Sequence, residues 1–235
     1  MFNNGGSIFF TPTFNNYIEI FSEGHFTKYL LNSLTVGVST ILIATILGMF
    51  AAYGFARFKF RSNAMLRLVS LLPQMLPPIT IIVPLFTLFT GLKLLDTRLA
   101  LIISYLTFTM PLSIWMMIGF FEDIPVELEE SAMIDGCRRI WALIKIELPI
   151  VAPGIAAVMV LSFIYSWNEF LYAVILTGRG SRTLPVMITS FMTNKAILWG
   201  RIGAAGSLVI FPVLFFTLFS QKYLIKGLTS GSVKG

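Results

Sequence analysis

The sequence predicts an all-α integral membrane protein with five transmembrane helices. Of the 235 residues, 56% are hydrophobic and only 12% are charged, whereas about a quarter of the residues in a soluble domain are charged. The 22 phenylalanines and 11 methionines would leave a soluble monomer with larger exposed apolar patches than such proteins tolerate. Five apolar stretches are long enough to cross the hydrocarbon layer, which takes about 20 helical residues. These observations exclude a soluble enzyme, a secreted disulfide scaffold and a disordered tail.

The five expected helices follow one another without an internal repeat, so a single membrane domain accounts for residues 30–225. A polar lead-in, residues 1–29, precedes them and includes a short predicted helix near 14–21. A tail, residues 226–235, follows them. The spans are expected at about 30–56, 66–92, 99–121, 150–176 and 202–224.

The second span contains four prolines, which remove backbone donors and bend helices. It is therefore expected to be discontinuous, either because it lines a permeation cavity or because it is kinked for packing. The four are Pro73, Pro77, Pro78 and Pro84.

Small residues recur at four-residue spacing in the first span. Such a stripe lets two helix backbones approach closely. The spacing does not say whether the neighbouring helix belongs to this chain or to another subunit. The stripe consists of Ala44, Gly48, Ala52 and Ala56.

The distribution of lysine and arginine predicts the orientation. The gaps after the first and third spans, together with the tail, hold ten of them, against seven on the opposite side. Since positive charge is retained on the cytoplasmic side, the C-terminus is expected inside and the N-terminus outside. An outside N-terminus without a signal sequence leads to the expectation that a further helix precedes residue 1. The net charge of +6 is thus explained by membrane topology and not by nucleic-acid binding.

Few residues are available for catalysis or metal binding. The single cysteine, Cys137, has no internal disulfide partner, and with the single histidine, His25, it cannot form a zinc site of three or four ligands. The sequence contains no G-x-x-x-x-G-K-[ST] phosphate loop and no G-x-S-x-G motif. Any ATP that drives this protein must therefore be hydrolysed by another chain.

The most informative segment is the loop between the third and fourth spans, residues 122–149. Asp123 is a plausible N-cap, Pro125 fits the first turn, and Gly136 can take the left-handed conformation that ends a helix. These signals predict a short helix from about Pro125 to Asp135. By itself, such a helix is either a docking element or an ordered surface loop.

A second, amphipathic helix is expected after Gly136, lying along the membrane surface. Its apolar residues recur every four positions, at Ile140, Ile144 and Leu148. Pro149 is expected to mark the turn into the fourth span. A helix–glycine–helix elbow joined almost directly to a span can transmit force from a docked partner.

The spacing within this loop resembles the EAA loop of ABC importer permeases, a coupling helix that docks on the ATPase. The resemblance implies that the glutamate faces donors on the ATPase, that the two small residues allow close seating in a cleft, and that the glycine allows a sharp exit. The family usually has alanine at the position of Ser131. The residues concerned are Glu130, Ser131, Ala132, Asp135, Gly136, Ile146, Leu148 and Pro149.

Further segments resemble the carbohydrate-uptake branch of these permeases, in particular the maltose-type second sugar permease, over nearly the whole chain from about Phe14. They include Leu31–Leu34, Ala51–Tyr53, Leu95–Thr97, Trp167–Phe170, Thr183–Val186 and Lys226–Gly235. Such permeases have six spans, so the first would be missing here.

The resemblance implies a multi-pass protein of a bacterial or archaeal cell membrane, surrounded by lipid. It implies a second homologous permease subunit, an ATPase dimer that binds ATP and Mg, and an extracytoplasmic sugar-binding protein. The chain itself is expected to be non-catalytic and to hold no cofactor, and to import a di- or oligosaccharide. The extracytoplasmic loop 177–200 would contact the binding protein.

Asn168 and Glu169 are candidates for the substrate path, because acidic residues within a membrane are expensive and usually functional. Glu169 is expected to contact sugar hydroxyls, to pair with the partner permease, or only to form an internal hydrogen bond. Alternatives to sugar import are a proton-coupled carrier with Glu169 as its coupling acid, a membrane-embedded enzyme, and an ABC importer for a polyol or glycerophosphodiester.

Overall fold

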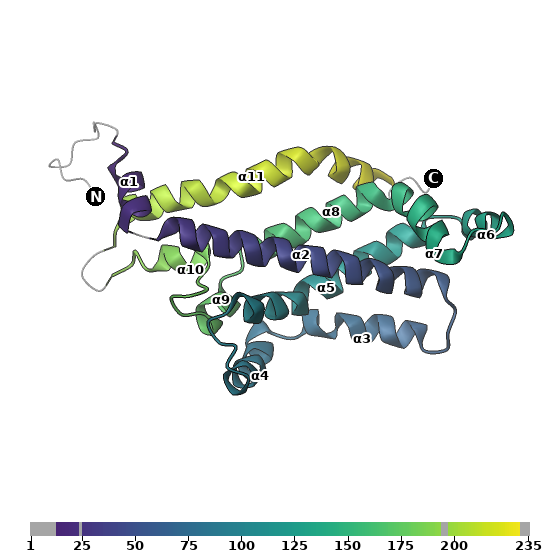
Figure 1. Cartoon of the computed structure of the whole chain (residues 1–235), viewed down its shortest axis with the longest axis horizontal. Helices are drawn as coiled ribbons and strands as arrows, with labels where there is room; N and C mark the ends of the chain where they lie inside the picture. Colours follow the sequence, from purple (N-terminus) through teal and green to yellow (C-terminus); the bar gives the residue numbers. More distant parts are fainter. Residues whose placement is uncertain (1–12, 24, 194–196, 231–235) are drawn as a thin grey trace.

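A computed structural model, which describes residues 13–23, 25–193 and 197–230, is a bundle of long helices with shorter helices at both ends (Figure 1). No β-strand occurs in these described ranges. We call the end that bears α6 and α7 the α6 end and the opposite one, with α1, α9 and α10, the α10 end. The elements are α1 (Asn15–Glu23), α2 (Phe26–Arg57), α3 (Asn63–Met75), α4 (Pro78–Gly91), α5 (Arg98–Glu122), α6 (Val126–Ile134), α7 (Arg139–Ala142), the π-helical turn η1 (Leu143–Glu147), α8 (Leu148–Trp167), α9 (Leu171–Leu176), α10 (Leu184–Thr189) and α11 (Trp199–Ser230).

The prediction of five membrane-spanning helices is confirmed if one broken span is included. Helices α2, α5 and α11 and the run from α7 to α8 are each long and apolar enough to cross a membrane. The fifth consists of α3 and α4, which meet at an angle of 88°. The break follows from the prolines, because the residue before a proline is driven out of the helical region. Leu76 and Pro77, each followed by proline, are accordingly extended, with ψ of 138° and 133°.

The fourth span differs from its prediction at both ends. The expected turn at Pro149 is wrong, since one continuous helical run extends from Arg139 to Trp167. The π-helical turn η1 comes just before Pro149, and the Leu148 N–H bonds to Leu143 O, five residues back. This wider turn allows the helix to continue through a residue that has no N–H of its own. At the other end the helix stops at Trp167, so Asn168 lies in a break before α9.

The short helix expected in the loop is confirmed as α6, with one correction at its start. Asp123 is not its N-cap but follows the last residue of α5, where its N–H bonds to Gly119 O at 3.0 Å. Pro125 occupies the N-cap position instead, with an extended ψ of 131°, and its carbonyl accepts the Leu128 N–H.

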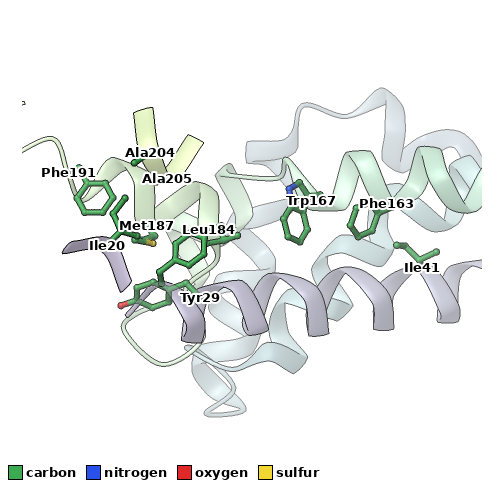
Figure 2. Close-up of a cluster of buried hydrophobic side chains, with 11 residues drawn as sticks. Ile20, Tyr29, Ile41, Phe163, Trp167, Leu184, Met187, Phe191, Ala204 and Ala205 are labelled. Atoms are coloured by element: carbon green, nitrogen blue, oxygen red, sulfur yellow. The ribbon is translucent and has the colours of Figure 1, made fainter. Parts of the chain in front are cut away.

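The α2 helix forms the centre of the bundle, packing against α5 and α8. The small-residue stripe of α2 explains the contact with α5: a Cβ added at Gly48 would lie 2.9 Å from Ser113 Cβ. The neighbour of that stripe is therefore in this chain. Towards the α10 end, a cluster of buried side chains joins α1, α2, α8, α10 and α11 (Figure 2). Its aromatic centre is the stacked pair Phe163 and Trp167, with ring centroids 5.3 Å apart.

Candidate functional site

Helix α6 presents an acidic and apolar surface at its end of the bundle (Figure 1). We call the exposed residues Glu130, Ser131, Ile134 and Asp135 the α6 face. Ile134 is 85% exposed, the largest exposed fraction among the exposed large apolar side chains of the described residues. Ala132, by contrast, packs inward and is only 7% exposed. Its small side chain lets α6 lie close to the rest of this chain, and not to a partner.

The turn after α6 is built around Gly136, as the sequence predicted. Gly136 has a φ of 85°, a conformation that favours glycine. Its N–H bonds to Met133 O at 3.1 Å, and the N–H of Cys137 bonds to Ala132 O at 2.9 Å. These two bonds define a Schellman motif, which satisfies the last carbonyls of α6 and reverses the chain into α7.

The second half of the motif lies outside the α6 face. Ile146 is half-buried in η1, and Leu148 is half-buried where α8 begins. Pro149 is exposed beside them. Because η1 packs against α6, the two halves of the motif are neighbours. The second half forms the connection to the span.

A buried ion cluster, which motif spacing did not reveal, ties α6 to the bundle. Glu129 is 2% exposed, and its Oε1 accepts a hydrogen bond of 2.6 Å from Tyr53 Oη and lies 2.9 Å from Arg139 Nε. Arg57 Nε lies 3.4 Å from Glu129 Oε2 and 2.9 Å from Glu147 Oε1. Glu147 is fully buried. We call Tyr53, Arg57, Glu129, Arg139 and Glu147 the Arg57 cluster.

A cavity of about 750 Å³ opens where the broken span meets the gap between α8 and α9. Asn168 and Glu169 both line it, together with Gln74, Phe108 and Tyr165. Polar groups beside aromatic rings in a cavity of this size suit a small polar ligand.

Glu169 also has an internal role at the edge of this cavity. Its Oε1 accepts the N–H of Tyr172 at 2.9 Å, and its Oε2 accepts the N–H of Ala173 at 3.2 Å. The carboxylate therefore caps the first turn of α9. Asn168 is exposed and donates to Ile164 O at 2.8 Å. An internal hydrogen bond was one of the roles expected for Glu169, and its partners here are the N–H groups of α9.

At the α10 end, Asp96 organises the loop between α9 and α10. Its carboxylate accepts hydrogen bonds of 2.8–3.1 Å from the N–H groups of Gly178, Gly180 and Ser181 and one of 2.9 Å from the Ser181 hydroxyl. Burial alone would raise the pKa of Asp96, but these donors outweigh it and lower the pKa. Asp96 itself has a φ of 57°, which places the carboxylate over the loop.

Two residues of α2 complete this anchor. The amide of Asn32, fully buried, donates to Gly180 O and Arg182 O and accepts a hydrogen bond of 2.8 Å from Arg98 Nε. Ser33 Oγ accepts the N–H of Leu184 at 2.9 Å. We call Asn32, Ser33, Asp96, Arg98 and the loop 178–184 the Asp96 knot. It brings together three segments, around residues 32, 96 and 183. In the sequence each of these segments resembled the sugar permeases, but nothing indicated that they are in contact.

The structure shows no metal centre among the residues it describes: no group of three or more His, Cys, Asp or Glu side chains is placed to hold an ion. The described residues instead form an exposed acidic and apolar surface on α6, a cavity beside the broken span and a braced loop at the opposite end.

Comparison with known proteins identifies similar chains. The family model described as "Binding-protein-dependent transport system inner membrane component" matches residues 44–230. The chain is 38% identical to the trehalose transport system permease protein SugB of Mycobacterium tuberculosis, over 96% of this chain and 83% of that one. It is 34% identical to the trehalose/maltose transport system permease protein MalG of Thermococcus litoralis, over 96% and 83%. A crystal structure of a bacterial ABC transporter involved in alginate import matches the fold with a TM-score of 0.75 at 23% identity, over 93% and 83%.

Proposed function

The chain belongs to the family of binding-protein-dependent transport system inner membrane components, and we propose that it is the sugar-importer permease subunit that forms half of the translocation path and couples it to an ATPase. It is a multi-pass membrane protein of the carbohydrate-uptake branch, as its relatives for trehalose and maltose indicate. The observation that most supports coupling is the α6 face, exposed at one end of the bundle and fixed to two of its spans by the Arg57 cluster.

The α6 face is the proposed contact with the ATPase, on the side of the membrane that we propose to be cytoplasmic. Glu130 and Asp135 offer carboxylates to basic or backbone donors, and exposed Ile134 offers an apolar anchor. The short side chain of Ser131 lets a partner approach the helix closely. An apolar centre with a polar rim is the usual composition of a protein interface. ATP and Mg are then bound by the ATPase dimer, and closure of the dimer displaces α6.

The cavity beside Asn168 and Glu169 is the proposed part of the sugar path in this subunit. The Asn168 side chain is exposed, and Tyr165, 60% exposed, provides an aromatic face. Glu169 retains lone pairs beyond those used to cap α9. A second, homologous permease would close the other side of this path.

The loop held by the Asp96 knot is the proposed contact for an extracytoplasmic sugar-binding protein. Its backbone is fixed by Asp96 while the side chain of Arg179 remains exposed. Such pre-organisation lowers the entropy lost on docking.

Purification of the chain from its native membrane, followed by identification of the co-purifying proteins, tests this function. We expect an ATPase, a second permease and a sugar-binding protein, whose ligand would distinguish a sugar from a polyol or a glycerophosphodiester. A preparation of this chain alone that transports without ATP would overturn the proposal and favour a proton-coupled carrier.

The variant Gly136→Pro tests the coupling role of α6. Proline fixes φ near −65° and cannot adopt the φ of 85° found here. We expect the purified complex to lose the link between ATP hydrolysis and sugar uptake. The matched control is Gly136→Ala, which strains the turn but keeps its N–H and should retain part of the coupling. A proline at Gly119 would not serve as a control, because it would break a span.

Glu169→Gln tests the sugar path. This substitution keeps the shape and one acceptor but removes the charge. If sugar affinity and coupled ATP hydrolysis are both unchanged, direct contact between Glu169 and the sugar is excluded.

A further inference from the structure

The buried guanidinium of Arg57 lies where three structural elements meet. Its side chain is only 3% exposed and stands at the last residue of α2. Its Nε lies within ion-pair distance of Glu129 in α6 and of Glu147 in η1, and its Nη1 donates to Ile124 O at 3.2 Å, in the turn before α6. One side chain thus joins the end of α2, the helix that bears the α6 face and the start of the fourth span.

The two carboxylates depend on Arg57 to different degrees. Glu129 has a second cation, Arg139, and a hydroxyl donor, Tyr53. Within the described part of the chain, Arg57 is the one cation that forms an ion pair with Glu147. Glu147 Oε2 has no hydrogen-bond partner among those residues. Arg57 Nη2 is likewise buried without a partner.

Stability alone does not account for such a cluster. A buried ion pair loses its hydration, and apolar side chains of similar volume commonly hold helices together as well or better. The two unpartnered polar atoms add to that loss. What an ion pair provides, and an apolar contact does not, is a fixed geometry between specific atoms of different helices.

The covalent route from α6 to α8 is irregular at two points. It passes through the Gly136 turn, then through α7, which has four residues, and then through the π-helical turn η1 before Pro149. The Gly136 turn and η1 depart from regular α-helical hydrogen bonding, whereas α7 belongs to the helical run that continues to Trp167. The Gly136 turn and η1 are therefore the two places where the backbone between α6 and α8 can bend.

We propose that Arg57 is a positioning residue that makes α6, the end of α2 and the start of α8 move as one body, so that displacement of α6 reaches two spans at once. The inference rests on the proposed function, since it assumes that an ATPase moves α6. Because α2 packs along α5, movement of the end of α2 extends to the centre of the bundle. Arg57 therefore acts through the helices it joins and touches neither the sugar nor ATP.

The test uses the complete transporter, with its ATPase and binding protein, reconstituted in liposomes. The readout is the number of sugar molecules imported per ATP hydrolysed. For Arg57→Gln we expect this ratio to fall at least about fivefold, the lower range of measured coupling between sites. The matched control is Arg67→Gln, which removes an arginine–glutamate pair at the same end: Arg67 Nη1 lies 2.6 Å from Glu122 Oε1, but the two side chains are 25% and 47% exposed. The control is expected to retain the wild-type ratio.

A second variant separates positioning from folding. Arg57→Gln combined with Glu147→Gln leaves no unpaired charge at Glu147, so it should assemble as well as the wild type. We expect its ratio to stay low, because the brace between α2 and η1 is still absent. A wild-type ratio in this double variant would overturn the proposal. If the wild-type complex itself imports sugar without an ATPase, the proposed function fails first and the inference fails with it.

A distance measurement tests the same idea without altering the cluster. Spin labels at Val126 in α6 and Lys59 just after α2, both exposed, report on the two elements in a chain with Cys137→Ser. The proposal predicts that their separation is the same in nucleotide-free and ATP-bound transporter. A change of more than about 2 Å, the upper size of common helix shifts in switching proteins, would overturn it.

Discussion

The two ends of the molecule are each organised around one charged side chain, but by different chemistry. Asp96, exposed at the α10 end, accepts its hydrogen bonds from backbone N–H groups and one hydroxyl of the loop 178–181. Arg57, buried at the α6 end, faces the carboxylates of Glu129 and Glu147. The first anchor fixes a loop, and the second fixes the relative position of helices.

This difference teaches which end tolerates sequence change. Most of these donors are backbone groups, so an exposed residue such as Arg179 can change without loss of the knot. Gly178 and Gly180 cannot, because an added Cβ would lie 2.9 and 2.8 Å from Asp96 Oδ2. Freedom to change at an exposed position suits a surface that has to match a particular binding protein. The Arg57 cluster depends on specific side chains, so the loss of Arg57 leaves Glu147 buried without its cation.

Of the variants that test this difference between the two ends, Arg57→Met is expected to lower the stability of the protein most. It leaves Glu147 buried without its cation, and removing one partner of a buried pair costs about 3–5 kcal/mol. We expect a correspondingly large fall in the midpoint of thermal unfolding of the purified complex. Arg57→Met combined with Glu147→Met should recover most of that stability, since well-packed apolar pairs often replace ion pairs without loss.

The control for this prediction is Arg67→Met, where the arginine is half-buried, pairs with exposed Glu122 and also donates to Asn63 Oδ1 and Phe55 O. Pairs open to solvent contribute about 0–1 kcal/mol and water can replace part of the other bonds, so this variant should lose much less stability than Arg57→Met. Equal losses for Arg57→Met and Arg67→Met would mean that the α6 end is no more sensitive than an ordinary surface.

A smaller effect is expected from Asp96→Ala at the opposite end. The variant loses the acceptor for four donor groups of the loop. Because the site is exposed, water replaces part of what is lost, and we expect a cost of about 1–2 kcal/mol. The loop should open locally, so trypsin should cleave after Arg179 several times faster, and the unfolding midpoint should fall by at least about 2–4 °C. Asp123→Ala, at an exposed aspartate of the α6 end, is the control and should leave cleavage at Arg179 unchanged.

The sequence predicted the spans better than the contacts between them. Apolar length alone located the helices, the prolines located the break between α3 and α4, and Gly136 located the turn after α6. These features depend on local chemistry and were therefore visible in the sequence. The continuation of the helix through Pro149 was missed because it depends on a π-helical turn that has no clear sequence signal.

The choice between neighbouring glutamates could not be made from motif spacing. The EAA resemblance directed attention to Glu130, which is exposed, whereas Glu129 is the buried acid. Helix rotation decides which of the two points inward. One signal was available: Glu129 lies three residues before Ala132, on the same side of the helix, and Ala132 is also buried. The Asp96 knot could not be predicted, because its segments are far apart along the chain. Asn32 and Asp96 are 64 positions apart, and the loop begins 82 positions after Asp96.

The smallest expected effect is a pH dependence confined to the α10 end. The pKa of Asp96 in the folded protein is lowered from its ordinary value of 3.8 by the hydrogen bonds of the loop. A carboxyl whose folded pKa is lowered stabilises the fold above its unfolded pKa, and that contribution is lost as the pH falls through the folded pKa. Between pH 7 and 5 the aspartate is ionised in both states, so its contribution is constant there.

Thermal unfolding of the wild type and of Asp96→Asn at a series of pH values measures this contribution. Asparagine keeps one acceptor oxygen but is neutral at every pH. We therefore expect the wild type to unfold about 2–4 °C higher than the variant, the shift that corresponds to about 1 kcal/mol in a chain of this size, at all pH values down to 5. The gap should close only below about pH 4, where Asp96 becomes protonated. A gap that closes already between pH 7 and 5 would show that Asp96 is not held as an anion by the loop, and the two ends would then differ less than their geometry indicates.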